Sequence, residues 1–327
     1  MNPKCNLALM SLYLILCAIF CSPLNCHAAT SIPCGGAAAG SITAAAQVDT
    51  YTFTAAAGDV ITIRAARVTG DTNYFNIVLE LDAPDGSLVG TGTWQIDKTL
   101  TASGTYTVKA RDDNNTHTGT YILTWQKVNN PCNATALNAG EVAVGDLGQT
   151  VDNPPWRYYS FTGAAGDVVT LRAARTAGDT NYFNVYLELF APNGTRIGNA
   201  LWQIDQTLPQ NGTYTILVRD DNTTQAGSFA LDWQRLTNPV NATPLNCGEM
   251  AAGNLGQTME NPPYRYYSFT GAVGDLVTLR AARTAGDTIY FNVYLELFAP
   301  NGTRIGNGLA DRPDPAPERH LYNSGPG

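Results

Sequence analysis

The stretch FNVYLELFAPNGTRIGN at Phe183–Asn199 recurs letter for letter at Phe291–Asn307. In its first half every second residue is apolar, and these residues form one face: Phe183, Val185, Leu187 and Leu189. A period of two predicts a β-strand, because successive side chains of a strand point to opposite faces. Tyr186 and Phe190 make the other face partly apolar, so we expect this strand to be covered on both faces or to lie under a loop. The letters APNG then predict a tight turn, since proline presets φ and glycine accepts positive φ.

The offset between the two occurrences, 291 − 183 = 108 residues, runs through most of the chain. AAGDVITIRAAR at Ala56–Arg67 returns as AAGDVVTLRAAR at Ala164–Arg175 and as AVGDLVTLRAAR at Ala272–Arg283. A period of this length is that of a whole small domain rather than of a solenoid unit. We therefore predict three repeats: a first over residues 33–130, a second over 131–238 and an incomplete third over 239–308.

Turn signals separate the alternating runs of each complete copy. They recur about every 8–12 residues, which corresponds to about seven or eight short strands per copy. The predicted fold class is all-β, with tandem antiparallel β-sandwich domains of jelly-roll-like form and a truncated third copy. Residues 309–327 are rich in proline and show no alternation, so we expect a divergent, disordered tail. Three explanations for the broken third copy stay open: a truncated or frame-shifted gene end, a strand donated by another chain, or closure of the half sandwich on copy 2.

The first residues predict an export signal. An apolar run at Leu7–Cys21 follows Lys4, and small residues follow at Ala28 and Ala29. Such a run is too short to span a bilayer and is typical of a signal peptide, here residues 1–29; the alternative is an uncleaved N-terminal helix. We expect a secreted protein, extracellular or periplasmic, with no transmembrane segment after signal cleavage. A net charge of −8 argues against nucleic acid as a partner.

Several segments of the second copy are similar to a known family. AGDVVTLRAAR, YLELFAPNGTRIG, GTYTILVRD and GSFALDW resemble the bacterial pre-peptidase C-terminal (PPC-like) domain. The resemblance implies a jelly-roll-like accessory module that is generally non-catalytic and is appended to secreted peptidases and other exported proteins. It also implies that some members bind calcium or assist attachment to a substrate or surface. No peptidase precedes the repeats in this chain.

Three cysteines remain after the expected signal cleavage. Copy 1 has Cys34 at its start and Cys132 after its last predicted strand. Copy 2 has neither, and copy 3 has only Cys247 at the opening position. Paired presence and paired absence predict a Cys34–Cys132 disulfide, which an oxidising compartment allows. The alternative is two free or intermolecularly paired thiols.

The repeated polar residues give no pattern typical of an enzyme. No repeat position holds histidine in every copy, so a nucleophile would lack its base, and we expect no enzyme activity. The repeated acids Glu80, Glu188 and Glu296 are interpreted as strand-edge partners of the repeated arginines Arg64, Arg172 and Arg280.

Two sets of residues are candidate binding sites. RDDNNT and RDDNTT each place carboxylate and amide oxygens in one loop, and these predict a calcium site: Asp112, Asp113 and Asn114, and Asp220, Asp221 and Asn222. The alternative is a turn whose side chains cap their own backbone. Trp94 and Trp202 are candidates for stacking on a sugar ring, and core or sheet-edge packing is the alternative. Trp125 and Trp233 are interpreted as core residues.

Taken together, these features predict a secreted, non-catalytic accessory, binding or spacer protein. Its expected partner is a cell-surface or extracellular polysaccharide or protein, and no cofactor is expected apart from calcium. Two alternatives stay open: a fragment of a larger secreted hydrolase (peptidase or glycosidase) whose catalytic domain is missing, and a calcium-stabilised carbohydrate-binding module.

Overall fold

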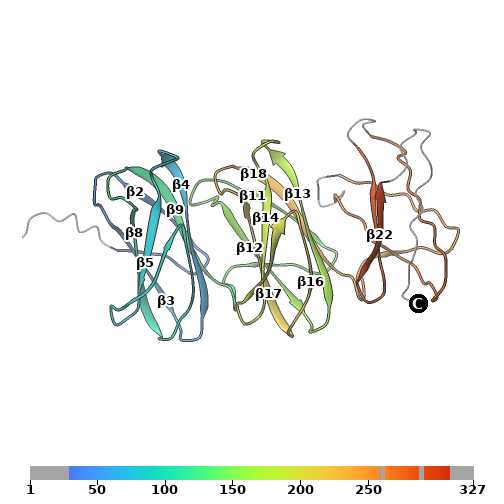
Figure 1. Ribbon diagram of the computed structural model, residues 1–327, viewed down its shortest axis with the longest axis horizontal. Helices are drawn as coiled ribbons and strands as arrows, with labels where there is room; N and C mark the ends of the chain where they lie inside the picture. Colours follow the sequence, from blue (N-terminus) through green and yellow to red (C-terminus); the bar gives the residue numbers. More distant parts are fainter. Residues whose placement is uncertain (1–28, 257, 259–261, 287–290, 310–327) are drawn as a thin grey trace, which may run out of the picture.

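The computed structural model describes residues 29–256, 258, 262–286 and 291–309 of the 327-residue chain. These residues form three units that follow one another in a row (Figure 1). We call them module 1 (residues 30–128), module 2 (135–236) and module 3 (243–309). The predicted signal peptide and most of the predicted tail lie outside the described residues. No helix in the described part of the chain is long and apolar enough to cross a membrane.

Module 1 is a sandwich of two sheets. A five-stranded sheet has the order β1-β3-β8-β5-β6, and a four-stranded sheet has the order β2-β9-β4-β7. The strands are β1 (Thr30–Ser31), β2 (Ala37–Ile42), β3 (Asp49–Ala55), β4 (Val60–Gly70), β5 (Ile77–Asp82), β6 (Leu88–Thr93), β7 (Gln95–Thr99), β8 (Gly104–Asp112) and β9 (Gly119–Lys127).

Module 2 repeats this topology strand for strand. Its sheets have the orders β10-β12-β17-β14-β15 and β11-β18-β13-β16. The strands are β10 (Thr135–Ala136), β11 (Val142–Leu147), β12 (Trp156–Gly163), β13 (Val168–Gly178), β14 (Val185–Phe190), β15 (Arg196–Leu201), β16 (Gln203–Thr207), β17 (Gly212–Asp220) and β18 (Gly227–Arg235). The predicted all-β fold of tandem sandwiches is confirmed. The short strands β1 and β10 pair with β3 and β12 in parallel, and the other strand pairs of modules 1 and 2 are antiparallel.

The alternating residues of the sequence fill the space between the two sheets of each module. Phe183, Val185, Leu187 and Leu189 are all fully buried, as the opening stretch predicts. An aromatic pair crosses each core, Phe53 on Trp125 in module 1 and Phe161 on Trp233 in module 2, with ring centroids 4.2 Å apart in both. The core placement of both tryptophans is thereby confirmed. The predicted APNG turn also forms, with Gly194 at φ 82° and its amide donating to Ala191.

A disulfide joins Cys34 to Cys132 with an S–S distance of 2.08 Å, as predicted. It ties the beginning of module 1 to the loop that follows β9. Cys247 is exposed and is not in a disulfide.

Module 3 contains few strands although its letters repeat those of module 2. The described strands are β19 (Thr243–Pro244), β20 (Tyr267–Ser268), β21 (Tyr294–Phe298) and β22 (Arg304–Leu309). Residues 276–286 match β13 in sequence but form no strand. In module 2 this strand lies between β18 and β16, and the described residues include no counterpart of either. A strand without neighbours has no partners for its backbone groups, so Leu276 is left 74% exposed.

Candidate functional site at the junction of modules 1 and 2

The four-stranded sheet of module 1 packs against the five-stranded sheet of module 2 (Figure 1). Three apolar side chains from each side form one buried cluster: Ala66, Ile122 and Val128 of module 1, and Trp156, Phe190 and Leu217 of module 2. This contact covers the outer face of β14, so the strand is buried on both faces as the sequence predicts. A hydrogen bond from Thr215 Oγ1 to the carbonyl of Val128, 2.9 Å long, also crosses the junction.

A carboxylate lies at the centre of this junction. Glu188 accepts a hydrogen bond of 2.9 Å from Arg64 of module 1, and bonds of 3.1 Å from Arg196 and Arg219 of its own module. The Glu188 side chain is 2% exposed and that of Arg64 is 5% exposed. Burial by itself raises the pKa of a carboxyl group, but the charge of Arg64 and the bonds from Arg219 and Arg196 hold the pKa of Glu188 below its ordinary value. Glu188 is therefore ionised inside the interface.

The same contact recurs one repeat further on. The residues that lie 108 positions after Arg64 and Glu188 are Arg172 and Glu296. Arg172 of module 2 pairs with Glu296 of module 3, which also accepts from Arg304 at 2.9 Å. The sequence interpretation of strand-edge pairs between these glutamates and the repeated arginines needs a correction. Arg64–Glu188 and Arg172–Glu296 do pair, but each pair lies between neighbouring modules, and Glu80 pairs with Arg111 instead. Consecutive modules therefore use one head-to-tail interface twice.

Module 1 differs from module 2 on the face that, in module 2, packs against module 1. The positions that correspond to Phe190 and Leu217 hold Asp82 and Lys109 (190 − 108 = 82, 217 − 108 = 109), and these form an ion pair. Glu80, at the position of Glu188, pairs only with Arg111, at 3.3 Å and with its side chain 29% exposed. The apolar residues at this face in module 2 therefore belong to its contact with module 1.

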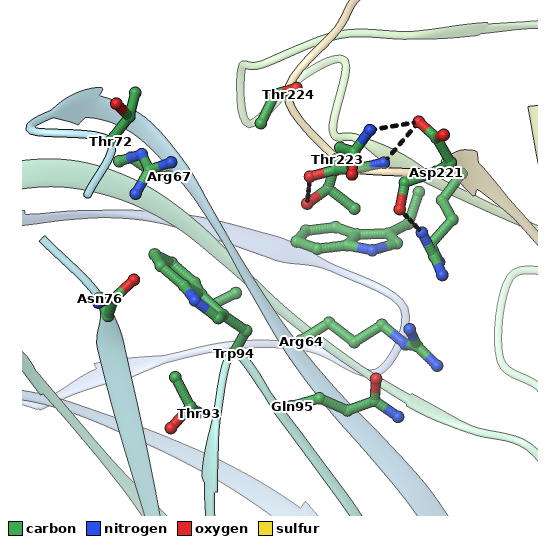
Figure 2. A pocket seen from close by; sticks show the side chains of 14 residues that line it. Arg64, Arg67, Thr72, Asn76, Thr93, Trp94, Gln95, Asp221, Thr223 and Thr224 are labelled. Carbon is green, nitrogen blue, oxygen red and sulfur yellow. Dashed lines mark hydrogen bonds between the residues drawn. The ribbon is translucent and has the colours of Figure 1, made fainter. Parts of the chain in front are cut away.

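A cleft of about 300 Å³ opens at the edge of the junction (Figure 2). Both modules line it, and polar side chains predominate. The lining includes Arg67, Asn76, Trp94 and Gln95 of module 1, and Asp221 and Asn222 of module 2. Figure 2 shows Trp94 on one side and the loop with Asp221 and Thr223 on the other. The cleft thus joins two elements that are far apart in the sequence.

Trp94 has an unusual backbone conformation. Its φ is 65°, a region that bulky residues rarely adopt because the Cβ atom crowds the backbone. Two backbone hydrogen bonds fix it: its amide donates to Ile77 at 2.9 Å, and its carbonyl accepts from Ala65 at 2.8 Å. The guanidinium of Arg67 lies 5.8 Å from the centre of the indole ring. Trp202 has the same φ of 65°, so the conformation belongs to the repeat. Strained residues of this kind concentrate at binding sites.

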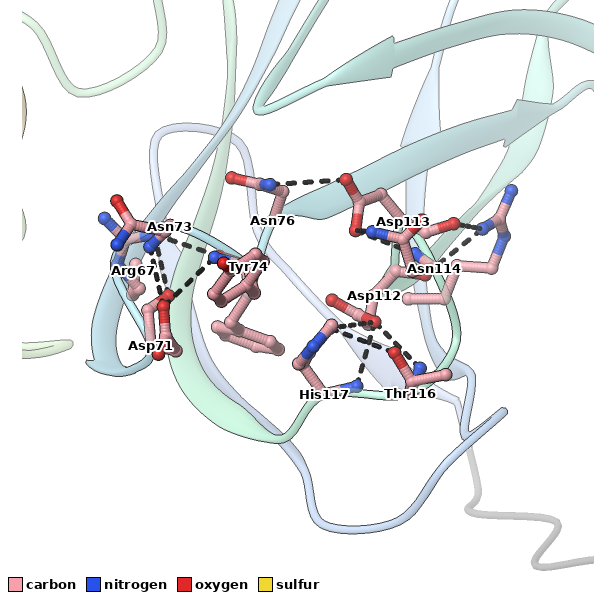
Figure 3. Close-up of polar contacts among 12 residues, drawn as sticks. Arg67, Asp71, Asn73, Tyr74, Asn76, Asp112, Asp113, Asn114, Thr116 and His117 are labelled. Atoms are coloured by element: carbon pink, nitrogen blue, oxygen red, sulfur yellow. Dashed lines mark hydrogen bonds and ion pairs between the residues drawn. The ribbon is translucent and has the colours of Figure 1, made fainter.

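The predicted calcium loops hold their carboxylates against the backbone (Figure 3). In module 1, Asp112 accepts from the amides of Thr116 at 2.9 Å and of His117 at 3.0 Å. Asp113 accepts from Asn76 and from the amide of Asn114. Burial opposes ionisation of Asp112, but these amides hold its pKa below the ordinary value. No group of three or more His, Cys, Asp or Glu side chains suited to a metal occurs among the described residues. This geometry is that of a capped turn, and the calcium site stays a prediction.

The structure brings some of the predicted site residues together and separates others. Trp94, Asp221 and Asn222 line the junction cleft, whereas Trp202 and the loop of Asp112–Asn114 do not. Two residues of the junction, Trp156 and Arg219, were not predicted from the sequence. A signal for Trp156 was present, because its position is aromatic in copies 2 and 3 (Tyr264) but Val48 in copy 1. A large aromatic residue that copy 1 alone lacks indicates a contact between modules.

Comparisons with known proteins add the following. No protein-family model and no curated protein sequence matches the chain. Among solved structures, PliG of Aeromonas hydrophila, a periplasmic inhibitor of g-type lysozyme, is 19% identical over 31% of this chain and 96% of its own, with a TM-score of 0.23. The CUB1-EGF-CUB2 domains of rat MASP-1 are 11% identical over 63% of this chain and 99% of their own, with a TM-score of 0.20.

The tandem CBM22-1–CBM22-2 domains of Xyn10C from Paenibacillus barcinonensis are 9% identical over 60% of this chain and 93% of their own, with a TM-score of 0.18. Similarity at this level concerns the all-β fold and carries no argument about function.

Proposed function

We propose that this chain is an exported, non-catalytic binding or spacer protein in which PPC-like sandwiches are locked into a stiff array. The observation that carries the proposal is the repeated junction, in which Arg64 and Arg172 each bind a glutamate of the following module. Independent modules on a flexible tether need no such contact. A buried ion pair within an apolar cluster instead fixes one orientation, since its geometry is lost when the modules rotate.

The disulfide supports the export part of the proposal. Cys34 and Cys132 are joined, and disulfides persist in oxidising compartments such as the periplasm and the extracellular space. The expected signal peptide at residues 1–29 leads to the same compartment. The resemblance to PPC-like domains supports an accessory role beside other exported proteins.

Small-angle X-ray scattering of the full chain tests the stiffness. We expect the scattering of the wild-type protein to fit a single elongated arrangement of modules 1 and 2. Phe190→Asp introduces at the junction the residue that module 1 has at the same position, Asp82, and is expected to separate the modules. Glu80→Gln, on the outer face of module 1, is the control and should leave the profile unchanged. Wild-type scattering that requires a broad range of orientations between modules 1 and 2 would refute the proposal.

A further inference from the structure

We propose that the cleft between modules 1 and 2 binds a neutral oligosaccharide, with one sugar ring lying against the indole of Trp94. The inference rests on the proposed function, because the cleft exists only while the two modules stay docked. Four features carry it: the fixed position of Trp94, the composition of the lining, the hydrogen bonding of its arginines, and the difference between the two junctions.

The first feature is the position of the Trp94 ring. The backbone bonds to Ile77 and Ala65 hold the residue in its strained conformation, and the ring lines the cleft (Figure 2). Sugar rings expose C–H groups on one or both faces, and a flat aromatic face is their apolar complement. A ring that is held before the ligand arrives loses little conformational entropy on binding.

The second feature is the polar lining that faces Trp94. Asn76 and Gln95 come from module 1, and Asn222 comes from module 2. An amide side chain can donate and accept at once, which matches the hydroxyl groups of a sugar. Hydroxyl side chains of both modules add to this set: Thr72, Thr93, Thr223 and Thr224. A volume of about 300 Å³ is at the lower end of ligand sites and suits one enclosed sugar unit of a longer chain.

The third feature is the charge of the cleft. Arg64 and Arg219 line it, but both are bound to the carboxylate of Glu188. The remaining charges are one of each sign. Arg67 donates to the carbonyl oxygens of Asp71 and Phe75, and Asp221 accepts from its neighbour Asn222. Every arginine that lines the cleft thus already donates to an oxygen of the protein, which favours a neutral ligand over an acidic polysaccharide.

The fourth feature supplies an internal control. Trp202 has the same backbone conformation as Trp94 and holds the corresponding position in module 2. The opposite wall of the first cleft is the loop Asp221–Thr224 of module 2. No counterpart of that loop lies among the described residues, which end at Leu309. We therefore expect Trp94, which has this wall opposite it, rather than Trp202 to bind a sugar.

Isothermal titration calorimetry with the full chain tests the inference. The probes are cellohexaose, maltohexaose and mannohexaose as neutral ligands, and oligogalacturonate as an acidic one. At least one neutral probe should bind, and Trp94→Ala should weaken that binding by about tenfold or more, as expected for loss of an aromatic stacking contact. Trp202→Ala is the matched control and should leave the affinity unchanged. Asn222→Ala, an exposed position, should weaken binding with no change in melting temperature.

Several outcomes would overturn the inference. These are no binding of any neutral probe, binding of the acidic probe alone, or an equal effect of the two tryptophan variants. The scattering profile of the same sample separates this failure from that of the proposed function. A stiff array that binds no sugar refutes the cleft alone, whereas flexibly linked modules refute both.

Discussion

Replacing Glu188 by glutamine tests the account of the junction most directly. Glutamine has nearly the same shape, so packing is retained and only the negative charge is lost. The wild-type carboxylate is bound by Arg64, Arg196 and Arg219, whose side chains are 5%, 47% and 16% exposed. After the substitution Arg64 remains buried beside Arg219 with no carboxylate between them.

The expected cost follows from this burial. Removing one partner of a buried ion pair destabilises a protein by about 3–5 kcal/mol, because the other charge stays in a poorly solvated place. Glu80 occupies the same position in module 1, but it has one arginine partner and is 29% exposed. The loss of a half-exposed pair costs less than about 1 kcal/mol. We therefore expect Glu188→Gln to lower the free energy of unfolding by at least about 2 kcal/mol more than Glu80→Gln.

Urea unfolding followed by circular dichroism and tryptophan fluorescence measures this difference, since Trp156 is buried at the junction. Limited proteolysis of the linker at residues 129–134 gives a second readout, and Glu188→Gln should accelerate cleavage there. Equal free energies of unfolding for the two variants, within about 0.5 kcal/mol, would refute the reasoning. The pH dependence supplies a further check. The lowered pKa of Glu188 stabilises the native state above the ordinary value of 4.5, and this contribution is lost as the pH falls through the native pKa.

Three further predictions follow from the same contacts. Cys34→Ser should lower the stability of module 1 by about 4–5 kcal/mol, as expected for opening a loop of 98 residues, and reduction of the wild type should match it in calorimetry. Phe190→Ala should cost about 3–5 kcal/mol in urea unfolding, against less than about 1 kcal/mol for the control Asp82→Ala. Burial raises the pKa of Asp232 to about 7, opposed by the Tyr266 hydroxyl and by Arg172. The native state therefore keeps a proton that the unfolded chain releases above its ordinary pKa of 3.8. The contribution of Asp232 to stability should be largest below that value and should fall by up to about 1.4 kcal/mol per pH unit until the pH reaches about 7.

Each of these three predictions has a result that would contradict it. Reduction without effect on the melting of module 1 would exclude the stabilising role of the disulfide. Equal losses for the Phe190 and Asp82 variants would exclude an apolar junction. Asp232→Asn should abolish the loss of stability between about pH 4 and 7, and a slope that persists in this variant would assign it to another group.

The sequence by itself determined the local structure of the modules. The alternation in FNVYLELF, the APNG turn and the 108-residue offset predicted the strands, the connections and the repeated fold, since each depends on residues close together in the chain. The paired presence of Cys34 and Cys132 in one copy was also enough to predict the disulfide.

Only the tertiary structure decided which side chains contact a neighbouring module and which contact their own. Arg64 pairs with Glu188 rather than with Glu80 of its own module, because the outer faces of adjacent sheets meet across the junction. The same docking places Trp94 opposite the loop of Asp221, and this forms the cleft. Residues 276–286 match β13 but form no strand, since a strand needs neighbours to bind its backbone groups. Contacts of this kind depend on distant segments, and identical letters give different structures when those segments differ.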